Sequence, residues 1–136
     1  MSPASPHTFL QPEGWLPAKG YANGVMAKGR MIFTGGLVGW NARQEWEHAD
    51  MPGQFRQTLL NIVAVLDAAG ARPEHLVRLT WYITDKREYL DNLQAFGAAY
   101  RDVIGRHFPA MAVVQVSALV EDAAKIEIEA TAVVPD

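Results

Sequence analysis

The alternation of hydrophobic and polar residues is most regular in the second half of the chain. Residues 77–84 alternate apolar side chains with Arg, Thr and Tyr, which predicts a half-buried strand. The runs 108–116 and 125–133 are rich in Val, Ile and Ala and predict two further strands. Because apolar residues occupy both faces of these closing strands, we expect both faces to be buried.

The first half of the chain predicts shorter strands. Prolines recur through residues 1–18, which we expect to form an extended N-terminal arm. Residues 21–28 are weakly strand-like, and a turn leads from them into the β-rich segment 31–34. Gly35 and Gly36 follow directly, and the pair predicts a bulge or a close approach of another backbone or a ligand.

Two stretches have the spacing of amphipathic helices. The first begins after Asp50, which suits an N-cap, and ends at Gly70. The second begins at Asp85, with Glu88 spaced as in a capping box, and ends at Gly105. The predicted inward stripes are Phe55, Leu59, Ile62, Val63 and Leu66 in the first helix, and Leu90, Leu93, Gly97, Tyr100 and Ile104 in the second.

This order of elements predicts an α+β fold with a mixed sheet. Two helices suffice to cover only one face of such a sheet. The other face would remain apolar and exposed, and a surface of that size is unstable in water. The pattern therefore predicts self-association through the uncovered face.

Composition narrows the class of protein. The chain has 136 residues, a formal net charge of −3 and no cysteine, which predicts one domain, at 19–136 after the arm, without disulfides or thiol chemistry. No basic cluster is present that would favour a nucleic-acid partner. The N-terminus lacks signal-peptide character and no apolar run approaches membrane-spanning length, so we expect a cytoplasmic protein without a membrane partner.

Few side chains carry obvious chemistry. Glu127 and Glu129 lie on one face of an apolar strand, where each needs a partner or water. From the residues alone we favour a salt bridge at an edge or interface; the alternative is a carboxylate that holds a water or acts as general acid and base. The four histidines have no metal-ligand spacing, so no metal is expected.

Aromatic residues are a second group of candidates. Phe33 and Trp81 occupy strand segments and are expected to be mainly core residues. Trp40 and Trp46 border a polar loop, so they are better candidates for a pocket wall or a subunit contact. His107 precedes the closing Phe-Pro-Ala segment, and we expect a loop residue rather than a catalyst.

Several segments together resemble the YjgF/RidA (reactive intermediate deaminase) family. The resemblance covers roughly residues 19–134, and the order and spacing of its pieces make it specific. The matching segments are Lys19-Gly20-Tyr21, Ile32-Phe33-Thr34-Gly35-Gly36, Gln57-Thr58-Leu59-Leu60-Asn61 with Ala68-Ala69-Gly70, residues 77–85, Phe108-Pro109-Ala110 and residues 125–133.

The resemblance implies a fold, an assembly and an activity. Members of this family have a chorismate-mutase-like α+β fold with two helices on one face of the sheet. Three subunits pack their sheets into a central barrel, with clefts between neighbouring subunits. Deaminating members hydrolyse reactive enamines and imines, such as 2-aminoacrylate, to a ketoacid and ammonia without a cofactor.

The resemblance also assigns roles to individual positions. Tyr21 corresponds to a pocket residue, and Glu127 to the carboxylate that positions the attacking water. Met111 stands where deaminating members carry the arginine that binds the substrate carboxylate. Gly35 stands in place of a serine, and Leu37 in place of a glutamine.

The loss of the arginine predicts an altered substrate. We expect poor activity on small enamines and preference for a larger unsaturated substrate such as 2-aminomuconate, bound away from Met111 by an arginine at 78, 87 or 106 or by a histidine. The alternatives are a non-catalytic ligand-binding or protein-interacting member and, ranked last, a ribonuclease. The catalytic candidate is Glu127, and the substrate-binding candidates are Tyr21, Phe33, Gly35, Trp40, Arg87, His107, Met111, Ala112 and Val113.

Overall fold

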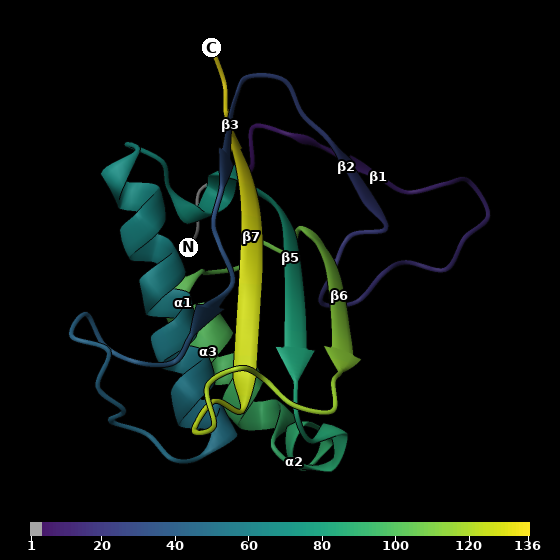
Figure 1. Cartoon of the computed structure of the whole chain (residues 1–136). Helices are drawn as coiled ribbons and strands as arrows, with labels where there is room; N and C mark the ends of the chain where they lie inside the picture. Colours follow the sequence, from purple (N-terminus) through teal and green to yellow (C-terminus); the bar gives the residue numbers. More distant parts are fainter. Residues whose placement is uncertain (1–3) are drawn as a thin grey trace.

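The computed structural model describes residues 4–136 and contains a mixed sheet with helices packed on one face (Figure 1). The strands run in the order β3-β7-β5-β6, and β4 also pairs with β7. The pair β5 and β6 is parallel, and the other pairs are antiparallel. The strands are β3 (Arg30–Phe33), β4 (Leu37–Val38), β5 (Leu76–Ile83), β6 (Ala110–Gln115) and β7 (Ile126–Val134).

The first predicted helix, α1 (Met51–Ala68), forms as expected and packs against one face of the sheet. Its N-terminus is capped by Asp50, whose carboxylate accepts a hydrogen bond of 3.2 Å from the Gly53 N–H. Its C-terminus is followed by Gly70, which has the left-handed φ of 72° that favours glycine. The buried side of α1 includes Phe55, Leu59, Ile62 and Leu66.

The second predicted helix is divided into α2 (Lys86–Leu90) and α3 (Leu93–Val103). The break falls where the Asn92 side chain donates a 2.7 Å hydrogen bond to the Glu88 carbonyl, which the helix would otherwise use internally. The predicted inward stripe is therefore wrong at its start, because Leu90 and Leu93 are exposed. A short 3₁₀ turn, Pro73–His75, precedes β5.

Glu88 does not act as the capping-box residue that its spacing from Asp85 predicted. Its side chain instead links α2 to the start of α1 and to Lys125 before β7. Its carboxylate accepts a 2.9 Å hydrogen bond from the Met51 N–H at the start of α1 and a 3.0 Å hydrogen bond from Lys125 Nζ. The cap of α2 is made by Asp85 alone, which accepts from the backbone of residues 87 and 88. Across residues 4–136 none of the helices combines the length and apolar character needed to cross a bilayer.

The core lies between the helices and one face of the sheet. Residues of β5 and β7 that point to this face, such as Leu79, Ile126 and Ile128, are fully buried. Phe55 of α1 packs on Trp81 of β5 with ring centroids 4.7 Å apart, and on Phe96 of α3 at 4.6 Å. These aromatic contacts fix the orientation of the Trp81 ring, as its predicted core position requires.

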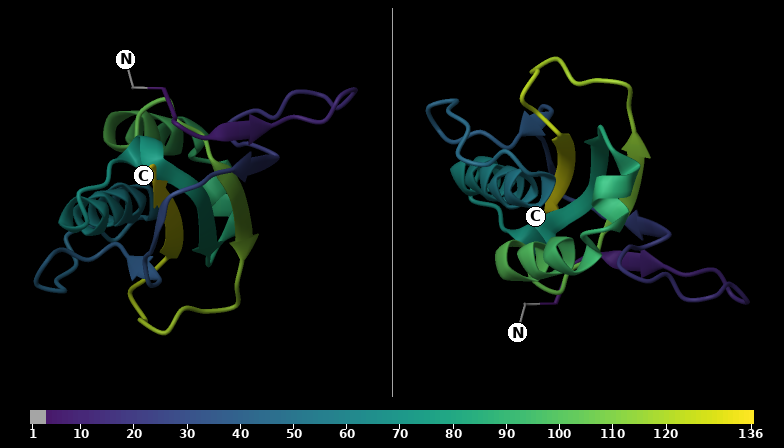
Figure 2. Two further views of the ribbon diagram at one scale, coloured as in Figure 1. Left: turned by 90° about the horizontal axis from the view of Figure 1, so that it is seen from above. Right: turned by 90° about the horizontal axis from the view of Figure 1, so that it is seen from below.

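The opposite face of the sheet carries no helix, as the sequence predicted (Figures 1 and 2). Large apolar side chains are exposed there: Met31 at 61%, Phe33 at 66% and Val114 at 44%. Within one chain only the helix side of the closing strands is buried, so burial of their second face stays a prediction that requires another copy. The expected core position of Phe33 is wrong in the single chain. An exposed apolar sheet face of this kind supports the prediction of self-association.

The N-terminal arm contains a strand that the proline pattern did not predict. Strand β1 (Thr8–Leu10) pairs antiparallel with β2 (Gly24–Met26), and the hairpin projects beyond the β6 edge of the sheet (Figure 2). The first three residues of the predicted arm lie outside the described residues.

The glycine pair interrupts the strand between β3 and β4, as its sequence predicted. At the interruption the Thr34 N–H donates to the Ala130 carbonyl, and the Thr34 hydroxyl accepts from the Ala130 N–H, both at 2.9 Å. The Thr34 side chain therefore replaces a backbone acceptor in the ladder with β7. This arrangement leaves the backbone of residues 35 and 36 next to the uncovered sheet face.

Candidate active site

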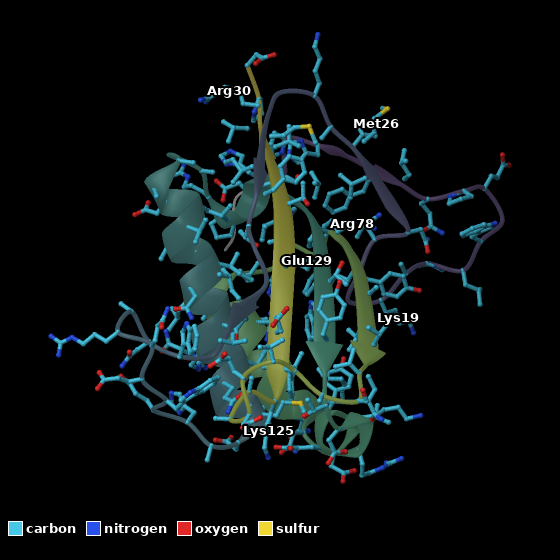
Figure 3. All side chains as sticks on the ribbon, viewed as in Figure 1. Lys19, Met26, Arg30, Arg78, Lys125 and Glu129 are labelled. Atoms are coloured by element: carbon cyan, nitrogen blue, oxygen red, sulfur yellow. The ribbon has the colours of Figure 1, made fainter. Side chains whose placement is uncertain are left out.

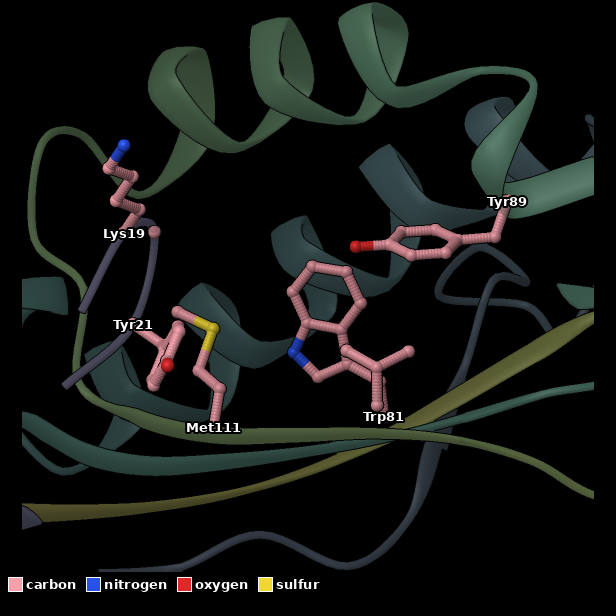
Figure 4. A pocket seen from close by; sticks show the side chains of 7 residues that line it. Lys19, Tyr21, Trp81, Tyr89 and Met111 are labelled. Carbon is pink, nitrogen blue, oxygen red and sulfur yellow. The ribbon is translucent and has the colours of Figure 1, made fainter. Parts of the chain in front are cut away.

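An apolar hollow lies on the helix side of the β6 edge (Figure 4). Its volume is about 330 Å³, at the lower end of the range for small-molecule sites. The residues that line it come from the segment before β2, from β5, from α2 and from β6. They are Lys19, Gly20, Tyr21, Trp81, Tyr89, Met111 and Val113.

A second hollow of about 280 Å³ shares Gly20, Trp81, Tyr89 and Met111 with the first. The shared residues make the two hollows adjoining parts of one cleft, which we call the aromatic cleft. Its further lining, from α3 and the loop before β6, is Leu93, Phe96, Gly97, Tyr100, Arg101 and Phe108.

Strand register brings the lining residues of the cleft together. In the parallel β5–β6 pair Trp81 lies opposite Val113, and Leu79 lies opposite Met111, so Trp81, Met111 and Val113 all point toward the helices. The segment that carries Tyr21 is held against β6 by a 3.0 Å hydrogen bond from the Ala22 N–H to the Pro109 carbonyl. Tyr21 and Met111 therefore meet in one site, although 90 residues separate them in the chain.

The cleft presents few polar groups. The indole Nε1 of Trp81 is buried and has no hydrogen-bond partner within residues 4–136. The Tyr89 ring packs edge-on against Trp81, with centroids 6.2 Å apart, and burial raises the pKa of its hydroxyl above the usual value. Tyr89 is therefore a neutral hydroxyl at physiological pH.

A second group of candidate residues lies on the uncovered face of the sheet. Glu127 of β7 pairs in register with Val38 of β4 and with Tyr82 of β5. Its carboxylate lies against the backbone of Gly36, so closely that a methyl group at position 36 would overlap it. The glycine pair thus makes room for this carboxylate, which explains the predicted close approach at residues 35 and 36.

Glu129 lies on the same face as Glu127 but is engaged elsewhere. It projects from the middle of β7 and accepts a 2.9 Å hydrogen bond from the Tyr82 hydroxyl (Figure 3). This hydrogen bond raises the pKa of Tyr82 above its usual value. The two glutamates therefore differ: Glu129 has a side-chain partner, and Glu127 packs on glycine.

The sequence grouped Glu127 and Met111 in one site, but one chain does not bring them together. Glu127, Gly35 and Phe33 belong to the uncovered face, whereas Tyr21, Met111 and Val113 line the cleft on the helix side. Because successive side chains of a strand point to opposite faces, register alone separates the two groups. Any site that uses both groups requires a second copy of the chain.

Three other candidates lie outside the cleft. Trp40 packs on Trp46 with ring centroids 5.6 Å apart. Arg87 is exposed and pairs with Asp91 at 3.5 Å. Ala112 points to the uncovered face, exposed in the single chain. None of the three is among the residues that line the aromatic cleft.

His107, a substrate-binding candidate from the sequence, is buried in the loop before β6 and is not among the residues that line the aromatic cleft. It is 4% exposed, its Nε2 lies 2.8 Å from the Leu76 carbonyl, and its own carbonyl accepts from the Tyr100 hydroxyl. Burial lowers the pKa of the imidazole below its ordinary value. The ring also packs on Phe9, with centroids 5.7 Å apart, and so helps hold β1.

Sequence reasoning missed Lys19, Tyr89 and the place of Trp81 in the cleft lining. Alternation correctly identified Trp81 as a core residue, but it gave no signal that one edge of the ring borders a cleft. Tyr89 lies in a helix that the sequence merged with the next one. Only the parallel pairing of β5 with β6 would have placed Trp81 beside Met111 and Val113.

Comparison with known proteins identifies the relatives of this chain. The family model described as Endoribonuclease L-PSP matches residues 13–134. The 2-iminobutanoate/2-iminopropanoate deaminase of Escherichia coli is 36% identical over 116 residues, which cover 83% of this chain and 86% of the relative. The chain belongs to the YjgF/RidA family.

Solved structures of the RidA family agree with this assignment. A Rid-family protein of unknown function from Yersinia pestis, YyfB, is 32% identical with a TM-score of 0.83, covering 94% of this chain and 98% of that one. The YjgF gene product of E. coli is 35% identical with a TM-score of 0.66, covering 83% and 87%. The α+β fold expected from the resemblance is therefore confirmed.

Proposed function

We propose that this RidA-family chain is a cofactor-independent deaminase that hydrolyses a reactive imine or enamine to a carbonyl compound and ammonia. The activity named for the E. coli relative supports this class of reaction. The observation that carries the proposal is the Glu127 carboxylate, half-buried and held against Gly36 in a chain of this family. A carboxylate with a fixed position and access to water is the group that imine hydrolysis needs.

We propose that the working form is a homotrimer with a site between neighbouring copies. One chain cannot present both Glu127 and the aromatic cleft to a single substrate, because they lie on opposite faces of the sheet. The exposed Met31, Phe33 and Val114 supply the apolar surface for packing that face against another copy. In such an assembly Glu127 of one subunit completes the cleft of the next.

The reaction then needs one water and two proton transfers. Glu127 accepts a proton from water as the water oxygen bonds to the imine carbon, and the proton passes to the imine nitrogen. The carbon–nitrogen bond of the resulting carbinolamine then breaks. The same carboxylate takes the hydroxyl proton and passes it to the departing nitrogen, so the products are a carbonyl group and ammonia.

The lining of the cleft supports a substrate larger than 2-aminoacrylate. Met111 offers no charge for a small carboxylate but adapts to an irregular apolar group. The walls supplied by Tyr21, Trp81 and Tyr89 are broad and aromatic. We therefore propose a conjugated or aromatic imine acid, of which 2-aminomuconate is one example, as the preferred substrate class.

The test is hydrolysis of two imines, one formed from 2-aminobutanoate and one from phenylalanine by an added amino-acid oxidase with oxygen as the oxidant. We expect faster ammonia release from the aromatic imine. Glu127→Gln should lower kcat by about 10²–10⁴-fold, the usual contribution of a general acid or base. Glu129→Gln is the matched control on the same strand face and should retain activity.

A different result would favour the non-catalytic alternative. If neither imine is hydrolysed faster than in buffer, or if Glu127→Gln and Glu129→Gln behave alike, the proposed chemistry is wrong. Sedimentation of the purified protein tests the assembly separately. A monomer with full activity would exclude a site between subunits.

A further inference from the structure

The Trp81 indole N–H is the one buried side-chain polar atom without a partner in residues 4–136. Trp81 is only 6% exposed, so solvent around the folded chain does not compensate for the missing acceptor. Buried polar groups in native proteins are almost always hydrogen-bonded, and an exception calls for an explanation. A ligand that brings an acceptor into the cleft supplies one.

The indole ring cannot turn to find another acceptor. It is fixed by Phe55 at 4.7 Å, by Tyr89 edge-on at 6.2 Å and by Phe96 at 6.4 Å between ring centroids. In this orientation its nitrogen edge faces the side of the cleft that holds Met111 and Tyr21 (Figure 4). The N–H can therefore donate a hydrogen bond only to an acceptor inside the cleft.

Access to the nitrogen involves Met111. The nitrogen is buried, and Met111 lies beside it in the lining of the first hollow (Figure 4). Methionine is unbranched and has several rotatable bonds, so the Met111 side chain adapts to a ligand beside the nitrogen at little cost.

The charges around the aromatic cleft favour an anion. Lys19 lines the first hollow and Arg101 the second, and neither forms an ion pair within the described residues. Among residues 4–136 no Asp or Glu lines either hollow. Within one chain, an acidic ligand group in either hollow would thus have one cation and the Trp81 N–H among the lining residues, and no carboxylate.

The walls of the cleft favour a flat ligand. Apart from Lys19 and Arg101 the lining is mostly aromatic or aliphatic, and its rings come from β5, α2, α3 and two loops. Aromatic walls bind planar conjugated groups through offset or edge-on contacts. A volume of about 330 Å³ suits a single small ring rather than a peptide.

We propose that the aromatic cleft binds a planar aromatic or conjugated carboxylate, with one carboxylate oxygen accepting from Trp81 Nε1 and its charge balanced by Lys19. Trp81 is then the residue that orients the carboxylate in this chain, in the absence of an arginine at position 111. The identification of the bound acid with the reacting imine rests on the proposed function. The binding site itself does not.

Binding is measured on the full chain with inert acids, by the indole N–H signals of the four tryptophans in ¹⁵N-labelled protein. The probes are benzoate and cinnamate, with benzamide as the uncharged analogue and butyrate as the non-aromatic one. We expect benzoate and cinnamate to shift the Trp81 signal downfield. Benzamide and butyrate should bind at least about tenfold more weakly, because each lacks one of the two recognised features.

Two variants separate the donor from the charge. Trp81→Phe keeps the ring contacts and removes the N–H, and it should weaken benzoate binding about tenfold or more. Lys19→Met should weaken binding several-fold, and as an exposed residue it does not threaten folding. The matched controls are Trp46→Phe, which lies outside the cleft, and Lys28→Met, and both should bind as the wild type does.

The inference is overturned if benzoate shifts no indole signal, or if Trp81→Phe and Trp46→Phe bind it equally. Its failure is distinguishable from failure of the proposed function. Benzoate binding is measured directly on the wild-type protein, and its outcome does not depend on whether any imine is hydrolysed. The converse outcome is that Trp81→Phe hydrolyses the imine with the KM of the wild type. That result would overturn the inference about Trp81 but would leave the deaminase proposal intact.

Discussion

The contact between Gly36 and Glu127 gives a sharp test of the catalytic carboxylate. A methyl group built on Gly36 would overlap Glu127 Oε2 and would lie 2.8 Å from Cδ and 3.2 Å from Cγ. Non-bonded carbon atoms prefer separations of about 3.5–4.0 Å. Gly36→Ala must therefore displace the carboxyl group by about 1 Å.

The expected loss follows from that displacement. A misplacement of about 1 Å at a reacting group costs on the order of 10²-fold in rate, which corresponds to about 2.7 kcal/mol of transition-state stabilisation. The fold should survive, because the clash falls on the end of a flexible side chain at the uncovered sheet face. Gly24→Ala is the matched control, since its nearest contact is an ordinary 3.4 Å to Leu10.

The assay compares kcat/KM for the preferred imine in four proteins: wild type, Gly36→Ala, Glu127→Gln and the double variant. If Gly36 acts only by leaving space for Glu127, the double variant should be no slower than Glu127→Gln alone. Full activity in Gly36→Ala, or additive losses in the double variant, would refute the reasoning. Circular dichroism and thermal unfolding establish that each variant is folded.

Three further predictions concern other parts of the molecule. Met111→Arg should raise kcat/KM for 2-iminobutanoate by about 30-fold or more, because it restores a charged contact to a small carboxylate; an unchanged rate would show that other machinery is missing. Gln54→Leu should lower the urea-measured free energy of unfolding by at least about 2 kcal/mol, since the buried amide bonds the His48 and Ala123 carbonyls and the Lys125 N–H, whereas Gln57→Leu should cost much less. Burial lowers the pKa of His107, so the unfolded chain binds the proton first as the pH falls: stability is complete above pH of about 6.5 and declines below it. In urea unfolding between pH 5 and 8, His107→Gln should flatten this decline, and an equal slope in both proteins would contradict it.

The elements that the sequence predicted well are those whose signals are local. The start of α1 follows from the side chain of Asp50, and its end follows from the freedom of Gly70 to adopt a left-handed φ. The period of two in β5 follows from burial of one sheet face. The break between α2 and α3 was missed, because Asn92 ends the first helix through a side-chain hydrogen bond that competes with the backbone.

Strand β1 and the exposure of Phe33 were missed for a different reason. Both depend on which segments meet in space: β1 exists because β2 pairs with it, and Phe33 is exposed because no helix reaches its face. The local propensities of the residues predict neither the pairing of β1 with β2 nor the exposure of Phe33. The uncovered face itself was predictable, since two helices cannot cover both sides of a sheet.

The sequence by itself determined the family, the α+β fold and the presence of Met111 where the resemblance leads one to expect an arginine. Tertiary structure decided how the candidate residues are grouped. Side chains alternate across a strand, and strand pairing fixes which strands are neighbours, so Glu127 faces one side of the sheet while Met111 and Trp81 face the other. The same pairing leaves the Trp81 N–H without an acceptor beside Met111. A donor is visible in the sequence, but the absence of its partner exists only in the fold.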